Sequence, residues 1–416
     1  MKKSIILDLF GFLGLSAYFF SCASPAPKGS ITEPVPIGGS IQISDPCEKS
    51  NIQWKGLDGV ARTPGEVRNS LLKATREQGV SGVSVGLRQG SNWSLESEAY
   101  YIDLGYSDPE CKNPIDSTTV FRADSLGESI IAYIVMQLVS QEMLDLDRPL
   151  FRYISSPSQT WPALSDIMKD RRLRRITARH VLSRRSGLTL SERANGPYKL
   201  AFREPPSRAF NLADKGYIFL TYVLEQKFNT NIGDLAKQLV FTPFGMSQSS
   251  FFREPRFRGH IAPVASDVTD SPEFPRAFEG EFFTNSRDFL KFTWNARLEN
   301  PYLAHMAFME YMILPSVSMR PTQIRRSEGQ GKILTPPKRL RWCMGWGTFY
   351  MSGVIHDICS FTGGYYPGIE SYAMVYESRR ATALIIFVVS SSKTPFVPAV
   401  IGELLGEFNS PLLIFQ

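Results

Sequence analysis

The chain has few of the residues on which metal, nucleotide and nucleic-acid sites are usually built. Its 416 residues include only four histidines and five cysteines, and their spacing to one another and to acidic residues does not match that of a zinc site. It contains no glycine-rich phosphate loop and no motif typical of nucleic-acid recognition. We therefore expect no metal, no cofactor and no nucleic acid among its ligands.

A long low-complexity tract is also missing, and the composition is that of a globular protein with a large core, 43% hydrophobic and 21% charged. The formal net charge of +6 favours acidic surfaces weakly and says nothing about the fold. The densest basic run spans residues 169–175. It is typical of a solvated helix end, and the alternative is a surface that touches anionic lipid or a polyanion.

The N-terminus has the pattern of an export signal. Lys2 and Lys3 precede an apolar run at residues 9–20, which is short for a membrane span, so residues 1–21 are predicted to be cleaved. Cys22 follows a small residue at the end of this run, which resembles the lipobox of bacterial lipoproteins. The resemblance implies lipidation of Cys22 and a membrane-anchored protein of a bacterial cell envelope. Ordinary cleavage after Ala23 is the alternative.

Composition then divides the rest of the chain. Residues 22–60 carry several prolines and glycines and few aromatics, which predicts a flexible tether. The fold is expected to begin near Thr63, within a domain at 61–405 that is followed by a tail at 406–416.

The remaining four cysteines of an exported chain suggest two disulfides, for which three connectivities exist. Cys343 and Cys359 lie in neighbouring strand-like runs and could pair across them, which leaves Cys47 with Cys111.

Periodicity indicates strands at both ends of the domain and helices between them. This order predicts an α/β (α+β) fold, in which one sheet is built from residues of about 61–120 and 338–405 and a mainly helical lobe of about 121–337 is inserted. A ligand cleft is expected between the two lobes. The expected helices are 66–77, 130–142, 176–183 with Thr177 as cap, 217–228, 232–239 and 397–408, and the expected strands are 82–87, 99–106, 342–350, 355–361, 370–376 and 382–389.

Ser125 stands where an extended segment becomes an apolar helix, and two interpretations compete for it. The run Ser125-Leu-Gly-Glu128 spells a capping box, in which the hydroxyl bonds an N–H of the first turn and Glu128 reaches back to the Ser125 N–H. The same junction can instead hold a nucleophilic hydroxyl at the mouth of a cleft, above the positive end of the helix.

The order of segments resembles the serine β-lactamase and penicillin-binding-protein superfamily, with the class C-like branch of β-lactamase-related serine hydrolases as the nearest pattern. The resemblance covers about residues 63–405 and implies an antiparallel sheet flanked by helices. The matching segments are residues 121–129, 141–149, 176–188, 210–217, 241–246 and 280–292.

The family's catalytic set is Ser-x-x-Lys, then Tyr-x-Asn, then Lys- or His-Thr-Gly. This chain keeps only the serine, as Ser125. Glu128 replaces the lysine, Leu212 the tyrosine, Asp214 the asparagine and Phe361 the last basic residue. A serine hydroxyl is a poor nucleophile without a neighbour that takes its proton, so these changes argue against acyl chemistry.

What survives around the third motif is Thr362, Gly363 and Gly364, whose backbone could form an oxyanion hole with the Ser125 N–H. Glu128 and Asp214 are weak bases unless buried; alternatively they act as a carboxylate pair or hold a cation. The cations expected to neutralise them are Lys215, Arg122, Arg184 and Arg185.

The sequence therefore predicts a pseudoenzyme that binds or scaffolds an envelope ligand or a partner protein. The alternative is an active esterase, amidase or peptidase in which Ser125 uses an unconventional base.

Overall fold

The structure is a computed structural model of the chain. It describes residues 41–42, 53–91, 97–108, 112–123, 125–154, 161, 164–193, 196–208, 210–211, 214–262, 281–299, 341–343, 345–350, 358–366, 368–377, 380–390 and 396–406.

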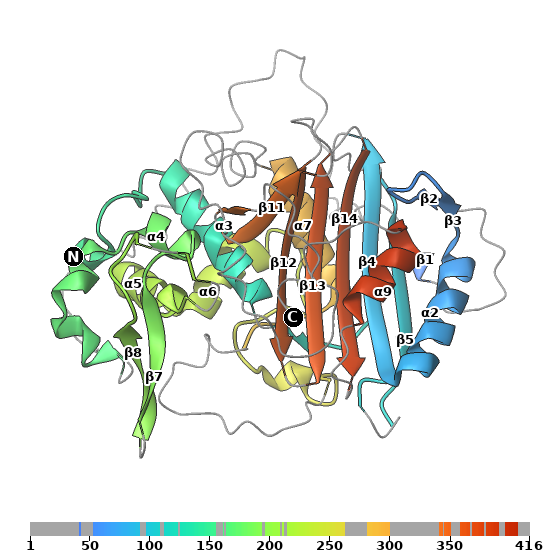
Figure 1. The fold of residues 1–416 in the computed structure, drawn as a ribbon, viewed down its shortest axis with the longest axis horizontal. Coiled ribbons are helices and arrows are strands. Elements are labelled where there is room, and N and C mark those ends of the chain that lie inside the picture. The colour runs from blue at the N-terminus through green and yellow to red at the C-terminus, as the bar shows by residue number, and fades with distance from the viewer. Residues whose placement is uncertain are drawn as a thin grey trace, which may run out of the picture.

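One eight-stranded sheet organises the molecule (Figure 1), with strand order β1-β5-β4-β14-β13-β12-β11-β10. Every neighbouring pair is antiparallel except β1 with β5. The strands are β1 (Ile41–Gln42), β4 (Val80–Ser91), β5 (Ala99–Gly105), β10 (Arg341–Cys343), β11 (Trp346–Tyr350), β12 (Ile358–Tyr366), β13 (Ile369–Glu377) and β14 (Arg380–Ser390).

The N- and C-terminal parts of the chain meet where β4 pairs with β14, with Val85 opposite Ile386. Residues 381–389 of β14 are all buried, because helices cover both faces of the sheet. Helices α2 (Pro64–Gln78) and α9 (Val397–Leu405) pack on one face, and α3 (Leu126–Ser140) and α7 (Ser286–Glu299) on the other. The expected fold class is therefore confirmed.

The inserted lobe holds α4 (Ala178–Leu182), α5 (Gly216–Phe228) and α6 (Ile232–Ala236) around α3. Thr177 caps α4 as expected, since its side chain accepts from the His180 N–H. The lobe also contains a hairpin that the periodicity did not predict, β7 (Leu188–Arg193) with β8 (Gly196–Phe202). The short helical turns of the lobe are η1 (Leu150–Tyr153), η3 (Ile167–Lys169), η4 (Arg171–Arg175), the π-turn η5 (Lys237–Phe241) and η6 (Pro255–Phe257).

The run expected as one strand at 342–350 is two strands, because Gly345 turns the chain between β10 and β11 with φ +85°. Only glycine adopts that backbone conformation without strain.

The folded domain also begins earlier than expected. Trp54 is 2% exposed, and its indole N–H donates to the Leu404 carbonyl at 2.8 Å. It lies in β2 (Trp54–Lys55), which pairs with β3 (Ala61–Arg62), and β1 lies still nearer the N-terminus. The tether boundary at residue 60 is therefore wrong, because one aromatic side chain fills a gap beside α9.

The predicted disulfide between Cys343 and Cys359 is wrong as well. Cys359 is a buried thiol in β12 and is not in a disulfide. Cys343 is on β10, and β11 lies between the two strands, since Cys343 pairs with Trp346 and Cys359 with Phe349. Adjacent strands lie about 4.8 Å apart, so two strand spacings exceed the reach of a disulfide. Cys22, Cys47 and Cys111 lie outside the described residues.

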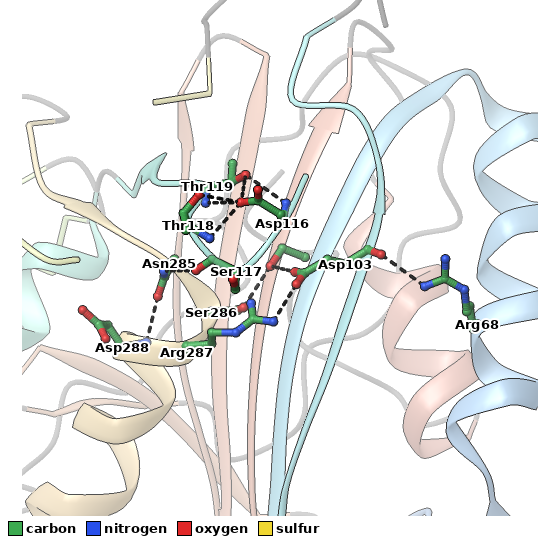
Figure 2. A network of polar contacts seen from close by, with 11 residues as sticks. Arg68, Asp103, Asp116, Ser117, Thr118, Thr119, Asn285, Ser286, Arg287 and Asp288 are labelled. Carbon is green, nitrogen blue, oxygen red and sulfur yellow. Dashed lines mark hydrogen bonds and ion pairs between the residues drawn. The ribbon is translucent and has the colours of Figure 1, made fainter. Parts of the chain in front are cut away.

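A polar network fixes the start of α7 against the sheet (Figure 2). The Asp103 carboxylate accepts from the Ser84 hydroxyl at 2.7 Å and pairs with Arg287 at 2.7 Å. Ser84 also contacts the Ser286 hydroxyl at 2.8 Å, and Asn285 donates to the Ser117 carbonyl at 3.2 Å. The last bond ties α7 to the loop that leads into the Ser125 segment.

Among the described residues, no helix is long and apolar enough to cross a membrane.

Candidate active site

Three segments hold the approach to Ser125. Strand β6 (Phe121–Arg122) pairs with β9 (Phe283–Thr284), and the Ala123 N–H donates to the Phe282 carbonyl at 2.7 Å. The Ser371 hydroxyl of β13 lies 3.1 Å from the Ala123 carbonyl and 3.3 Å from the Gly364 carbonyl. The third-motif strand β12 is thus linked through Ser371 to the residues just before Ser125.

The capping-box prediction is wrong. The Ser125 backbone is already helical, with φ −61° and ψ −8°, and its side chain makes no capping hydrogen bond. A capping residue normally has an extended backbone, which aims its hydroxyl at the first-turn N–H groups. Glu128 does not fold back either, because its carboxylate accepts a hydrogen bond from the Arg184 guanidinium.

The Glu128–Arg184 ion pair occupies the position at which the family carries its lysine. The Arg184 side chain is only 6% exposed and that of Glu128 17%. The Arg184 guanidinium also stacks on Trp342 of β10, 4.6 Å from the ring centroid. Arg184 was one of four candidate partners, and a second, Arg122, pairs with Glu281 at 3.7 Å instead. The stacking of Arg184 on Trp342 connects this pair to β10 at the edge of the sheet.

Asp214 is occupied by a different set of donors. Its carboxylate accepts from the Ser186 hydroxyl at 2.5 Å, the Gly187 N–H at 3.0 Å and the Gly216 N–H at 2.8 Å. Burial raises its pKa above the ordinary value, and these hydrogen bonds oppose that rise. Asp214 thus fixes the turn before β7 to the start of α5. Since Glu128 and Asp214 each have their own partners, they do not form the carboxylate pair considered from the sequence.

Tyr217 is a site residue that the sequence did not single out, because its place on an apolar helix predicts a core side chain. Its hydroxyl is buried and has no hydrogen-bond partner among the described residues. The hydroxyl lies 3.1 Å from the point that a Cβ on Gly345 would occupy, and the Glu128 carbonyl lies 3.5 Å from that point. Burial, followed by the charge of Glu128, raises the Tyr217 pKa well above its ordinary value. This phenol is therefore a proton donor, and not a base, at neutral pH.

The first residue of the third motif is the apolar Phe361, where the family carries a lysine or a histidine. Phe361 is 2% exposed and packs edge-on against Trp342, with ring centroids 6.5 Å apart. Phe210 of the inserted lobe also packs against Trp342, with ring centroids 6.0 Å apart. These three residues, the aromatic cluster, fill the junction between the lobes beside Arg184.

The small residues of the third motif keep their strand geometry. Thr362 is 1% exposed, Gly363 pairs with Tyr372 and Gly364 with Ser371. A Cβ on Gly363 would lie 2.9 Å from the Ser371 carbonyl, so this position has no room for a side chain. Leu212, at the position of the family tyrosine, lies outside the described residues. Among the described residues, no three His, Cys, Asp or Glu side chains come together as metal ligands.

The sequence pattern of the β-lactamase family matches residues 67–405. The chain therefore belongs to the β-lactamase family, within the serine β-lactamase and penicillin-binding-protein superfamily. No curated protein matches the chain in sequence.

Solved structures of low identity share the fold. A class C β-lactamase mutant superposes with a TM-score of 0.60 at 12% identity, covering 82% of this chain and 96% of that one. The octameric penicillin-binding protein homologue of Pyrococcus abyssi gives 0.58 at 16%, covering 85% and 78%. The D-amino acid amidase of Ochrobactrum anthropi SV3 gives 0.54 at 18%, covering 82% and 98%. These likenesses extend to the fold and do not define an activity.

Proposed function

We propose that the chain is a catalytically inactive member of the β-lactamase family that serves as a binding or scaffold protein of a bacterial cell envelope. The observation that carries this proposal is the Glu128–Arg184 ion pair. Acylation of a serine needs a neighbour that accepts the hydroxyl proton and returns it to the leaving group. In this chain the neighbouring side chain on α3 is a carboxylate whose acceptor oxygen is bonded to a guanidinium.

The rest of the site supports the same conclusion. The Tyr217 hydroxyl, near Glu128, has a raised pKa and holds its proton at neutral pH. Phe361 offers no charge for the carboxylate of a β-lactam or a peptide stem. The aromatic cluster occupies the junction at which such a group would bind. Partner binding would then use the outer surface of the domain.

The test is covalent labelling of Ser125. The full chain is incubated at neutral pH with a fluorophosphonate and with a fluorescent penicillin, beside Ser125→Ala. We expect neither probe to label the wild-type chain above the level of the variant. In a third arm, hydrolysis of a D-amino acid amide is measured for both chains, because one protein of this fold is a D-amino acid amidase. Labelling of the wild type that Ser125→Ala abolishes would establish the rival function, a hydrolase with an unconventional base.

Lipidation at Cys22 makes a separate prediction. Cells that express the chain and are fed an alkyne-bearing fatty acid should yield a labelled protein. Cys22→Ala should abolish the label and release the protein from membranes washed with high salt. Ser24→Ala is the matched control and should keep both. An unlabelled wild type, or a Cys22→Ala chain that stays in the membrane fraction after a high-salt wash, would contradict the lipid anchor.

A further inference from the structure

Six exposed cations gather on the inserted lobe. They are Arg148, Arg152, Lys169, Arg171, Arg174 and Arg175, here called the basic patch. None of the six makes an ion pair with a described carboxylate, whereas their neighbours do: Arg172 pairs with Asp170 at 2.7 Å and Arg179 with Asp147 at 2.7 Å. The patch therefore consists of cations whose charge is not neutralised by an ion pair with a described carboxylate.

The segment that contains the patch has a local excess of positive charge. Residues 142–185 contain ten Lys and Arg against five Asp and Glu, a net charge of +5, while the complete chain carries +6. This segment therefore has twice as many cations as anions. A cluster of this density creates a local potential that attracts polyanions.

Packing holds the patch together. Turn η1 lies against η4, and η3 also contacts η4. The Arg174 guanidinium lies over the Phe151 ring at 5.6 Å, and that of Arg148 over Tyr153 at 5.0 Å. The Lys227 ammonium of α5 also lies over the Tyr153 ring, 4.9 Å from its centroid. Rings beneath the cations support their stems and leave the charged groups at the surface.

We propose that the basic patch binds an anionic lipid surface, an inference that rests on the proposed lipid anchor at Cys22. Helix α4, which directly follows the patch, lies toward one end of the long axis of the molecule, and β1 lies toward the other (Figure 1). Cys22 precedes β1 by 19 residues, which span at most about 65 Å at ~3.5 Å per residue. A lipid at Cys22 and the patch can therefore contact one membrane when the domain lies along it.

The chemistry fits this occupant. Each Lys or Arg beside an anionic bilayer strengthens binding by about fivefold, and the attraction falls off within a Debye length of about 10 Å at 0.1 M salt. A lipid combined with a polybasic surface holds a protein more firmly than either alone. The proposal is independent of whether Ser125 is reactive, since none of the six cations belongs to the candidate active site.

The experiment uses the full exported chain carrying Cys22→Ala, so that no lipid masks the patch. Co-sedimentation is measured with phosphatidylglycerol–phosphatidylcholine vesicles and with pure phosphatidylcholine vesicles. We expect binding only to the anionic vesicles, weakening as salt rises. The triple variant Arg171→Gln, Arg174→Gln, Arg175→Gln should partition about a hundredfold more weakly. The matched control Arg76→Gln, Arg253→Gln, Arg258→Gln removes the same charge from exposed positions elsewhere and should bind like the parent.

Three results would overturn the proposal: equal binding to neutral vesicles, equal losses in the two triple variants, or no vesicle binding by a chain that binds polyphosphate or DNA. The labelling experiment on Ser125 uses different variants and a different readout. Labelling of Ser125 would not alter the vesicle result, and a lack of vesicle binding would not alter the proposal that the site is inactive.

Discussion

Replacing Glu128 by lysine is expected to lower the free energy of unfolding by about 3 kcal/mol and to leave the chain without turnover. The substitution restores the family's Ser-x-x-Lys pattern but places an ammonium beside the Arg184 guanidinium. That guanidinium is held by its stacking on Trp342 and has little exposed surface on which to gain water instead. Breaking a largely buried ion pair costs more than the pair contributes, because the remaining charge is uncompensated.

Turnover should not return, since the other proton-transfer positions are not restored. Leu212 stands at the tyrosine position and Phe361 packs into the aromatic cluster. Hydrolysis of a β-lactam or an ester by Glu128→Lys at a rate well above that of Glu128→Lys/Ser125→Ala would show that the lysine was the one missing part.

Urea unfolding measures the change in the free energy of unfolding. The charge-swapped double variant Glu128→Lys/Arg184→Glu should recover most of the loss caused by either single variant, which a double-mutant cycle measures as a coupling energy of about 2 kcal/mol. Lys73→Glu beside Glu77 is an exposed control and should change stability by less than about 0.5 kcal/mol. Additive losses in the cycle would mean that the two side chains do not interact.

Replacing Asp214 by asparagine, which restores the family residue, is expected to destabilise the fold by about 2 kcal/mol. Three donors converge on its two carboxylate oxygens. An amide offers one oxygen and turns an NH₂ group toward either the Gly187 N–H or the Gly216 N–H. Gly216 packs closely against Ser186, because a Cβ there would lie 2.6 Å from the Ser186 hydroxyl. Glu77→Gln makes the same chemical change at an exposed position and should be neutral.

This loss should depend on pH. Burial raises the Asp214 pKa above 3.8, so its contribution to stability is present in full below the unfolded pKa and is lost as pH rises through the folded pKa. The deficit of Asp214→Asn should therefore be larger near about pH 4 than near about pH 8. Thermal or urea unfolding of both chains across that range measures it. A deficit that grows as pH rises would show that the folded pKa is lowered instead.

The predictable parts of the fold are those where local pattern and tertiary environment agree. The apolar run of β14 and the Thr177 cap needed only nearby residues to specify them. The start of the fold at Trp54 could not be predicted, because a single tryptophan among polar residues gains its burial from Leu404, 350 positions away. The Cys343–Cys359 pairing failed for a related reason: Gly345 reverses the chain and inserts β11 between the two cysteines.

The features of the candidate site also fall into those that the sequence predicts and those that only the structure shows. The sequence by itself determined the family, the position of Ser125 and the loss of the lysine, the tyrosine and the last basic residue, because motif identity is written in the order of residues. Tertiary structure alone decided that Glu128 pairs with Arg184 and that Asp214 accepts a hydrogen bond from Ser186. It also decided that the Tyr217 hydroxyl lies near Gly345 without a hydrogen-bond partner among the described residues. The physical reason is that a charged or polar side chain is satisfied by whichever partner the fold brings within about 3 Å, and that partner lies far away along the chain.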